Sequence, residues 1–368
     1  MEIKNRELAE RLDSFIRGLK KEDRIAILHH TDPDGVSSAA ILNRIVEKAR
    51  GKRIDLRLSQ GPDELSIKKE TFSRLKKKKI SKLIIADLSL DQYPDYVQDT
   101  EKFAEMLILD HHKLYRNLNS KKTVHIKPQM ISSEVEASKY CTAKLAFDLG
   151  SRLFDLTESD WIAAIGIIGD NAADAWKDFL SKTFARNKIP AKKDAFSTII
   201  GKATETLFFT EAYDFRKAGE CYDILCSAKS SREVVNSRLS KYRKAIQQEI
   251  SYWKRNVRKL AEFYPKQELI FDYIKPRYAI KSAISSAISS LYPNRTIIIA
   301  QDMKRDFIQL SVRRRDSKVA VNDLLERSLK TLDSANGGGH RNSAGGRIRK
   351  EDLYKFKESV LRQLEILK

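Results

Sequence analysis

Three short apolar runs in the first third of the chain are each followed at once by acidic residues or histidines. The runs cover residues 25–28, 83–86 and 106–109, and they lead into His29 and His30, into Asp87 and into Asp110. Helical or loop segments separate them, so the repeated strand–helix–strand pattern predicts a parallel sheet with helices on its faces. Ligands of such sheets bind beyond the carboxyl ends of the strands. The sequence therefore predicts an α/β fold with a polar site at this edge.

The chain is long enough for about two domains, with 368 residues of which 41% are hydrophobic. We expect an N-terminal α/β domain over residues 1–185, a mainly helical basic connector over 186–267 and a smaller C-terminal α/β domain over 268–368. In the first domain, Ser37 is the expected cap of the helix that follows the first apolar run. A buried helix is predicted to begin near Trp161 and to end near Asp170.

The predicted connector ends in a basic amphipathic segment. Apolar residues recur at positions 239, 242, 246, 250, 253 and 257, close to heptad spacing. Nine Lys or Arg residues and two Glu residues lie between Arg238 and Lys266. Such a helix could bind a nucleic-acid backbone, pair with a second copy in a homodimer, or serve as an ordinary amphipathic connector.

The charge balance points to an anionic partner. Lys and Arg number 70 and Asp and Glu number 50, which gives a net charge of +20. Binding of a polyanion such as DNA or RNA would use this charge, although a Lys- and Glu-rich surface is also common in heat-adapted proteins, and an archaeal or thermophilic source is compatible with it.

The cysteine count and the absence of a predicted signal peptide or membrane span bear on the cellular compartment. Three cysteines are too few for a disulfide framework or a Cys-based zinc site. No signal peptide and no membrane span is predicted, and we expect a cytoplasmic protein with no membrane partner.

The six histidines are concentrated at the predicted site. His29, His30, His111 and His112 stand beside aspartates at strand ends, His340 lies in a glycine-rich segment, and His125 has no such setting. We group six residues as candidate metal ligands: His30, Asp32, Asp34, Asp87, His111 and Asp170. Carboxylates with a minority of imidazoles suit Mn²⁺ or Mg²⁺ better than structural zinc. Asp87 could bridge two ions about 3.5–4 Å apart, which together activate water against a phosphoryl substrate.

A glycine-rich segment near the C-terminus is predicted to bind an anion. Five of the 14 glycines lie between residues 337 and 346. Glycines let a backbone approach an anion closely and point its N–H groups at it, and His340 and Arg341 add donors. One arginine of the run 313–315 could bind a phosphate bidentately, and the other two are expected to be solvated.

These motifs resemble those of the DHH phosphoesterase superfamily. Asp110-His111-His112 resembles its signature, and His30-Thr31-Asp32-Pro33-Asp34-Gly35 resembles its first motif. Asp87 and Asp170 stand where the second and fourth motifs are expected. Gly337-Gly338-Gly339-His340 is similar to the GGGH motif of the DHHA1 domain in RecJ-like nucleases and nanoRNases.

The resemblance implies a role for each residue and a cleft between a DHH and a DHHA1 domain. One Mn²⁺ would take His30, Asp32 and Asp87, and a second would take Asp34, Asp87, His111 and Asp170. His112 would face the substrate phosphate, and Asp110 would orient the histidines. Arg313, His340 and the glycines Gly337, Gly338 and Gly339 would bind the nucleotide end. Asp87, Asp110, His111 and His112 form the expected catalytic group.

Two departures from the family pattern bear on this reading. Pyrophosphatase-like branches carry a histidine four residues before the first aspartate, where this chain has Leu28, whereas the RecJ-like branch has its ligand at the position of His30. This favours His30 over His29 without settling the choice. Ser343 replaces the first of two alanines that usually follow the glycine motif.

We therefore expect a Mn²⁺-dependent phosphodiesterase, with Mg²⁺ as an alternative ion, that hydrolyses single-stranded DNA or RNA ends or short oligonucleotides to mononucleotides. A dinucleotide or cyclic-dinucleotide phosphodiesterase is the second interpretation. The third is a replication or repair protein with a scaffold role, since RecJ-like archaeal proteins can associate with GINS.

Overall fold

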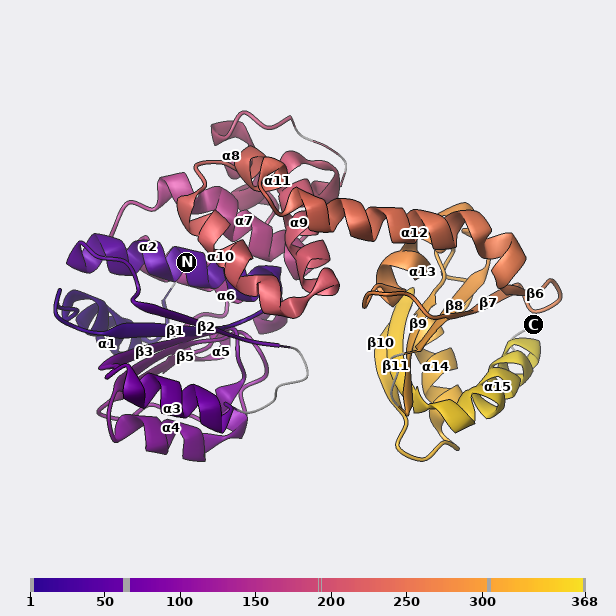
Figure 1. Ribbon diagram of the computed structural model, residues 1–368, viewed down its shortest axis with the longest axis horizontal. Coiled ribbons are helices and arrows are strands. Elements are labelled where there is room, and N and C mark those ends of the chain that lie inside the picture. The colour runs from indigo at the N-terminus through magenta and orange to yellow at the C-terminus, as the bar shows by residue number, and fades with distance from the viewer. Residues whose placement is uncertain (1–2, 62–66, 191, 193, 303–305, 367–368) are drawn as a thin grey trace. The chain divides into compact units, whose positions relative to one another are not determined.

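The computed structural model describes residues 3–61, 67–190, 192, 194–302 and 306–366. The chain forms two compact units, Met1–Arg243 and Lys244–Lys368, each built around its own β-sheet (Figure 1). Within the described part of the chain, no helix is both long and apolar enough to cross a membrane.

The first unit contains a five-stranded, fully parallel sheet, as predicted. Its strands are β1 (Ile25–His30), β2 (Leu56–Gln60), β3 (Lys82–Ala86), β4 (Glu105–Leu109) and β5 (Thr123–Ile126), in the order β2-β1-β3-β4-β5. The register pairs His29 with Ala86 and Ala86 with Leu109. The residues that follow these three therefore meet at one edge of the sheet.

Helices cover both faces of this sheet because its central strands are apolar on both sides. Alternate residues of β1, β3 and β4 pack with α2 and α7 in one core and with α3 and α4 in the other, as Figure 1 shows for α2, α3 and α4. The helices of this unit are α1 (Arg6–Arg17), α2 (Pro33–Arg50), α3 (Lys69–Lys77), α4 (Pro94–Glu101), α5 (Pro128–Ile131), α6 (Thr142–Gly150), α7 (Asp160–Gly169), α8 (Lys177–Arg186), α9 (Ile199–Tyr213), α10 (Ala218–Ser227) and α11 (Ser231–Asn236).

The start of α2 corrects one prediction. The cap of this helix is Asp32, whose Oδ1 accepts a hydrogen bond from Gly35 N at 2.8 Å, whereas Ser37 lies buried inside the helix. Pro33 occupies the first turn, where its missing N–H costs nothing and its fixed φ suits a helix. The predicted buried helix from Trp161 is confirmed as α7.

The second unit has a mixed six-stranded sheet in the order β10-β11-β9-β8-β7-β6. The β7–β8 pair is parallel and the other pairs are antiparallel. Its strands are β6 (Glu262–Tyr264), β7 (Leu269–Ile274), β8 (Thr296–Asp302), β9 (Phe307–Arg313), β10 (Asn336–His340) and β11 (Ser343–Arg349). The helix α12 (Ser240–Leu260) leads into this unit, which also contains α13 (Lys281–Leu291), α14 (Val321–Leu329) and α15 (Leu353–Ile366).

The expectation that Arg314 is solvated is wrong. Its side chain is only 1% exposed, and its guanidinium pairs with Glu268 at 2.6 Å and with Asp316 at 2.7 Å. Two carboxylates compensate the buried charge, which makes Arg314 a structural residue. Arg315 is exposed, as predicted, and donates to the hydroxyls of Ser289 and Ser290.

Candidate metal centre

The first two strand-end motifs meet because α2 begins directly after β1. Asp32 caps the helix, and its Oδ2 lies 3.0 Å from Nδ1 of His30 at the end of the strand. Asp34 lies in the first turn of the same helix. A Cβ on Gly35 would lie 2.6 Å from the carbonyl oxygen of His30, so this tight strand-to-helix turn requires glycine.

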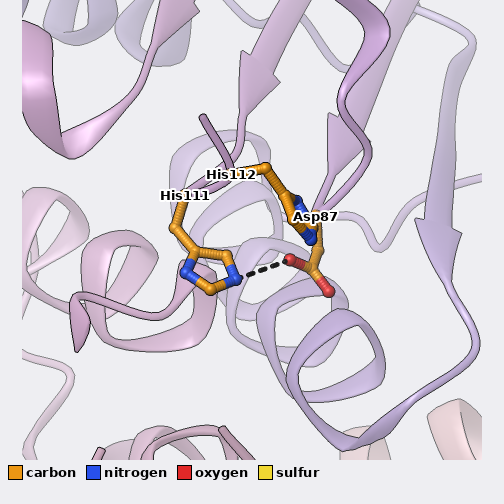
Figure 2. Close-up of side chains that lie close together, drawn as sticks. All are labelled: Asp87, His111 and His112. Atoms are coloured by element: carbon orange, nitrogen blue, oxygen red, sulfur yellow. Dashed lines mark ion pairs between the residues drawn. The ribbon is translucent and has the colours of Figure 1, made fainter. Parts of the chain in front are cut away.

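Asp87 occupies the middle of the site in an uncommon backbone conformation. It follows β3 with φ of +62°, a region that non-glycine residues seldom adopt. Its N–H donates to Leu109 O at 2.9 Å, and its Oδ1 accepts from the hydroxyl of Thr142 at 3.0 Å. The carboxylate lies between two histidines. Its Oδ2 is 3.8 Å from His30 Nδ1, and its Oδ1 is 3.6 Å from His111 Nε2, the contact drawn in Figure 2.

The carboxylate of Asp34 is held by the beginning of α6. Its two oxygens accept from the backbone N–H groups of Thr142 at 2.7 Å and Ala143 at 2.9 Å. The N-terminus of a helix carries a partial positive charge, which suits this anion. A Cβ on Gly166 of α7 would lie 2.5 Å from Oδ1 of Asp34, so glycine lets α7 approach the site closely.

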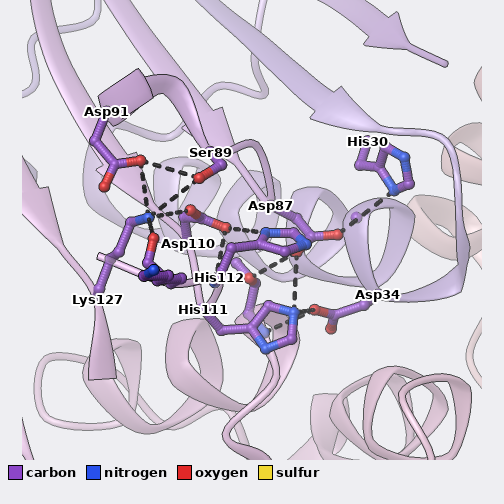
Figure 3. A network of polar contacts seen from close by, with 12 residues as sticks. His30, Asp34, Asp87, Ser89, Asp91, Asp110, His111, His112 and Lys127 are labelled. Atoms are coloured by element: carbon purple, nitrogen blue, oxygen red, sulfur yellow. Dashed lines mark hydrogen bonds and ion pairs between the residues drawn. The ribbon is translucent and has the colours of Figure 1, made fainter. Parts of the chain in front are cut away.

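Asp170 and His111 complete the cluster. Asp170 caps the end of α7, and its Oδ2 lies 3.1 Å from Nε2 of His111. The same nitrogen is 4.0 Å from Oδ2 of Asp34 (Figure 3). His111 therefore faces three carboxylates, those of Asp34, Asp87 and Asp170.

Among the residues that the structure describes, three overlapping groups of side chains have donor atoms within 4.8 Å of one another and could hold a metal ion. They are His30, Asp32 and Asp87; Asp34, His111 and Asp170; and Asp87, His111 and His112. The structure thus brings together all six predicted ligands, from residues that span positions 30 to 170.

His29 lies apart from these groups. Its side chain is fully buried, with the ring stacked on Tyr222 and Nδ1 2.7 Å from the carbonyl oxygen of His30. Burial lowers the pKa of His29 to about 4, so the imidazole is neutral at physiological pH. Of the adjacent pair, His30 is the one whose ring faces the aspartates.

The aspartates of the cluster need a nearby cation to be ionised together. Burial, followed by repulsion from Asp34 and Asp32, raises the pKa of Asp170 to about 9, and the same causes raise the pKa of Asp87 well above its usual value. In the described structure, none of the four aspartates pairs with Lys or Arg. Asp170 Oδ2 is buried there without a hydrogen bond. A set of carboxylates with two imidazoles fits a hard divalent cation such as Mn²⁺ or Mg²⁺.

Sequence reasoning missed the buried Lys127 behind the DHH signature. Its Nζ lies 2.8 Å from Oδ2 of Asp110 and 2.9 Å from Oδ1 of Asp91, and all three side chains are fully buried (Figure 3). Asp110 Oδ1 in turn lies 2.6 Å from Nδ1 of the half-exposed His112. Lys127 directly follows β5, a fourth strand end at the same edge, and that position was the available signal.

This chain of charges determines the protonation of His112. Burial alone would raise the pKa of Asp110, but His112 and Lys127 outweigh it and hold that pKa below its usual value. The Asp110 carboxylate raises the pKa of His112, against the opposing effect of burial. Asp110 therefore favours the protonated form of His112. Its contact uses Nδ1, so Nε2 is left for another partner.

A second missed residue is Glu211 on α9. Its Oε1 accepts a hydrogen bond from the hydroxyl of Thr31 at 2.6 Å, between the ligands His30 and Asp32. Burial and the charge of Asp32 raise the pKa of Glu211. The distance of 180 residues along the chain left no sequence signal for this contact.

The predicted substrate-binding residues lie in the second unit. The register pairs His340 with Ser343 and Ser343 with Arg313, so these three residues form one row across β10, β11 and β9. Arg313 donates through Nε to the hydroxyl of Ser285 at 3.1 Å, and His340 is exposed. The row brings a guanidinium and an imidazole to one end of these strands.

The glycine-rich segment forms the edge strand β10 and its neighbour β11 instead of an open loop. Close packing requires three of its five glycines: a Cβ on Gly337 would lie 2.7 Å from Leu329, and one on Gly346 would lie 2.8 Å from Asn336 O. Gly339 has φ of +149° and its Cβ would lie 2.5 Å from Ser343 O. These three glycines thus have a packing role whether or not they bind an anion, whereas a Cβ would fit at Gly338 and Gly345.

Two family models match the chain. The DHH family, N-terminal domain, matches residues 24–169, and the DHHA1 domain matches residues 270–365. No curated protein matches the chain.

Solved structures match almost the whole chain at low sequence identity. RecJ from Thermus thermophilus in complex with Mn²⁺ has a TM-score of 0.65 at 17% identity, over 98% of this chain and 54% of that one. An exonuclease RecJ bound to manganese has a TM-score of 0.60 at 19% identity, over 99% and 95%. The DHH domain of a member of a family of ribosomal proteins has a TM-score of 0.67 at 15% identity, over 99% and 91%. This chain spans about half the length of the Thermus protein, and the likeness shows a shared fold.

Proposed function

Because the chain belongs to the DHH/DHHA1 phosphoesterase superfamily, we propose that it is a divalent-metal-dependent phosphodiesterase that releases mononucleotides from the ends of single-stranded nucleic acids or short oligonucleotides. The observation that carries this proposal is the cluster of four aspartates and two histidines, in which Asp34 and Asp87 are buried and the other four side chains are partly buried. Its carboxylates need a cation to be ionised together, and divalent cations are the agents of phosphodiester hydrolysis in such sites.

We assign His30, Asp32 and Asp87 to one Mn²⁺ and Asp34, Asp87, His111 and Asp170 to a second, with Mg²⁺ as the alternative. When bound, these ions supply an activated water and charge stabilisation for the leaving oxygen. Asp110 keeps His112 protonated, and His112 donates from its free nitrogen to the substrate phosphate. Arg313, His340 and the backbone of Gly337, Gly338 and Gly339 bind the terminal nucleotide.

Two further observations support a nucleic-acid substrate. The net charge of +20 favours polyanions. The fold is shared with an exonuclease RecJ whose structure contains manganese. Association with replication or repair proteins such as GINS, and formation of a homodimer, are predictions for which a pull-down and sedimentation are the tests.

The test of the proposed function is the digestion of end-labelled single-stranded DNA and RNA, from dinucleotides to long oligonucleotides, with Mn²⁺, Mg²⁺ or EDTA. We expect a metal-dependent ladder of mononucleotide loss. Asp87→Asn should lower kcat/KM by roughly 10³-fold or more, because it removes the carboxylate shared by the two proposed ions. Asparagine tolerates the left-handed backbone of this position, so the fold should persist.

The matched control is Asp174→Asn, which changes a carboxylate that is 99% exposed and lies four residues beyond Asp170. This variant should cleave like the wild type. Full activity of Asp87→Asn would refute the assigned site. Cleavage confined to dinucleotides would instead identify a dinucleotide phosphodiesterase, and absence of cleavage with every substrate would support a scaffold role.

A further inference from the structure

The second unit contains a basic hollow that the proposed active site does not use. The hollow has a volume of about 610 Å³ and lies between the last turns of α12 and the end of α13. Its lining includes Ser251, Lys254, Arg255, Arg258, Leu291 and Tyr292. All of these belong to Lys244–Lys368 and form one local surface.

The charge of this hollow is uncompensated. Arg258 lies four residues after Lys254 and three residues after Arg255 on α12. At these spacings all three side chains lie on one face of the helix. None of the described residues that line the hollow is acidic. Among the described residues, none of the three cations forms an ion pair, and like charges this close repel one another. The arrangement favours an anionic ligand.

One of the three cations is held in position by the wall of the hollow. Arg258 donates through Nε to the hydroxyl of Tyr292 at 3.2 Å. Tyr292 caps the C-terminus of α13, which carries a partial negative charge. The hydrogen bond to Tyr292 holds Arg258, whereas Lys254 and Arg255 form no ion pair among the described residues. Arg258 uses only Nε for this hydrogen bond, so its two other guanidinium nitrogens can bind a phosphate.

We propose that this hollow binds the phosphodiester backbone of a single-stranded nucleic acid. The proposal rests on the proposed function, because it assigns a second contact to the same class of substrate. Two arginines match phosphate geometry better than lysines alone would. Aromatic side chains accompany the cations, with Tyr292 in the wall and Tyr252 on α12 50% exposed, and such mixtures bind single strands by stacking and charge. These features favour a nucleic acid over an acidic peptide.

The test is fluorescence anisotropy with labelled oligothymidylate and oligouridylate, the full chain and EDTA, which prevents hydrolysis. The triple variant Lys254→Gln, Arg255→Gln, Arg258→Gln should bind at least about tenfold more weakly at moderate salt. The slope of log Kd against log salt should fall by about 2, because each neutralised phosphate of a single strand contributes roughly 0.7. Unchanged circular dichroism would show that the variant is folded, which we expect since Arg255 and Arg258 are exposed.

The matched control removes three other charges, in Lys77→Gln, Lys78→Gln, Lys79→Gln, from an exposed lysine run of the first unit. This control variant should keep the wild-type Kd to within about twofold, and its slope of log Kd against log salt should match that of the wild type. Equal losses in both triple variants would refute the hollow as a site and indicate a diffuse charge effect. Oligonucleotide binding that the hollow variant retains in full would refute the inference, and so would absence of binding by the wild type. The proposed function is refuted separately, by absence of metal-dependent cleavage. Binding of labelled polyglutamate by the wild type but not by the hollow variant, with no oligonucleotide binding by either, would assign the hollow to an acidic protein.

Discussion

At the scale of single residues, Asp87 combines a position that the sequence reveals with a backbone conformation that it does not reveal. Its place after an apolar run is visible in the sequence, and it predicted a ligand at the strand end. Its φ of +62° is not visible, because tertiary contacts with Leu109 and Thr142 impose it. Such strain costs of order 1–3 kcal/mol and persists where the surroundings hold it. Asp87→Ala would therefore mix a backbone effect with the loss of a ligand, which Asp87→Asn avoids.

Lys127 offers a residue-scale prediction about stability. Lys127→Met should lower the free energy of unfolding by about 3–5 kcal/mol, because it leaves the buried carboxylate of Asp91 without a cation and that of Asp110 with His112 alone. Urea denaturation followed by circular dichroism measures this. The double variant Lys127→Met, Asp110→Asn should recover part of the loss.

The control for this prediction is Lys82→Met, which breaks a pair with the half-exposed Glu105. Exposed pairs contribute at most about 1 kcal/mol, so this variant should stay close to the wild type. A Lys127→Met protein as stable as Lys82→Met would show that the buried network contributes little to stability.

Asp272 on β7 gives a prediction about pH. Both of its carboxylate oxygens are buried and have no hydrogen-bond partner among the described residues, and burial raises its pKa to about 6. The folded protein then binds this proton more tightly than the unfolded chain does. Its contribution to stability is complete below the unfolded pKa and is lost as the pH rises from about 4 to about 6, by roughly 3 kcal/mol.

Denaturation curves at pH 4, 5, 6 and 8 test this, with Asp272→Asn as the comparison. The difference in unfolding free energy between variant and wild type should shift in favour of the variant as the pH rises to about 6, and then stay constant. A difference that does not change with pH would mean that Asp272 titrates normally in the folded protein.

At the scale of elements, the sequence predicted the strands better than the helix starts. β1, β3 and β4 are buried runs of Ile, Leu and Ala whose fully apolar character marks central parallel strands. The start of α2 was misplaced because Ser37 and Asp32 are both good caps, and local preference does not choose between them. The turn at Gly35, which lies against His30, makes the choice for Asp32.

The approach of α7 to the site gives a prediction at this scale. Gly166→Ala places a Cβ 2.5 Å from Oδ1 of Asp34 and 2.5 Å from Cβ of Ala143, so α7 must move away from α2 and α6. We expect a loss of about 1–3 kcal/mol in stability and weaker Mn²⁺ binding, measured by thermal unfolding and isothermal titration calorimetry. Gly169→Ala in the same helix meets Pro33 Cβ at 3.1 Å and should be milder. Equal effects of the two variants would contradict this account.

At the scale of the whole molecule, sequence reasoning predicted the α/β architecture and gathered six candidate ligands, but it did not find what supports them. The ligands follow apolar strands or a buried helix, and this local context is legible in a sequence. Lys127 and Glu211 act through contacts that depend on how β5 and α9 pack. The place of Lys127 after a strand is the one signal that the sequence offers for it, and Glu211 has none. The hollow beside α12 was anticipated only as a basic helix, because its other wall comes from α13.

The glycines of β10 and β11 bear on how relatives of this chain should be read. Gly337, Gly339 and Gly346 leave no room for a Cβ because neighbouring strands and α14 occupy that space. A descendant that lost its enzymatic activity would still have to keep these glycines in order to fold. Their presence in a genome is therefore a marker of ancestry. The full set of aspartates and histidines at the edge of the first sheet is the better record of whether the metal site is still under selection.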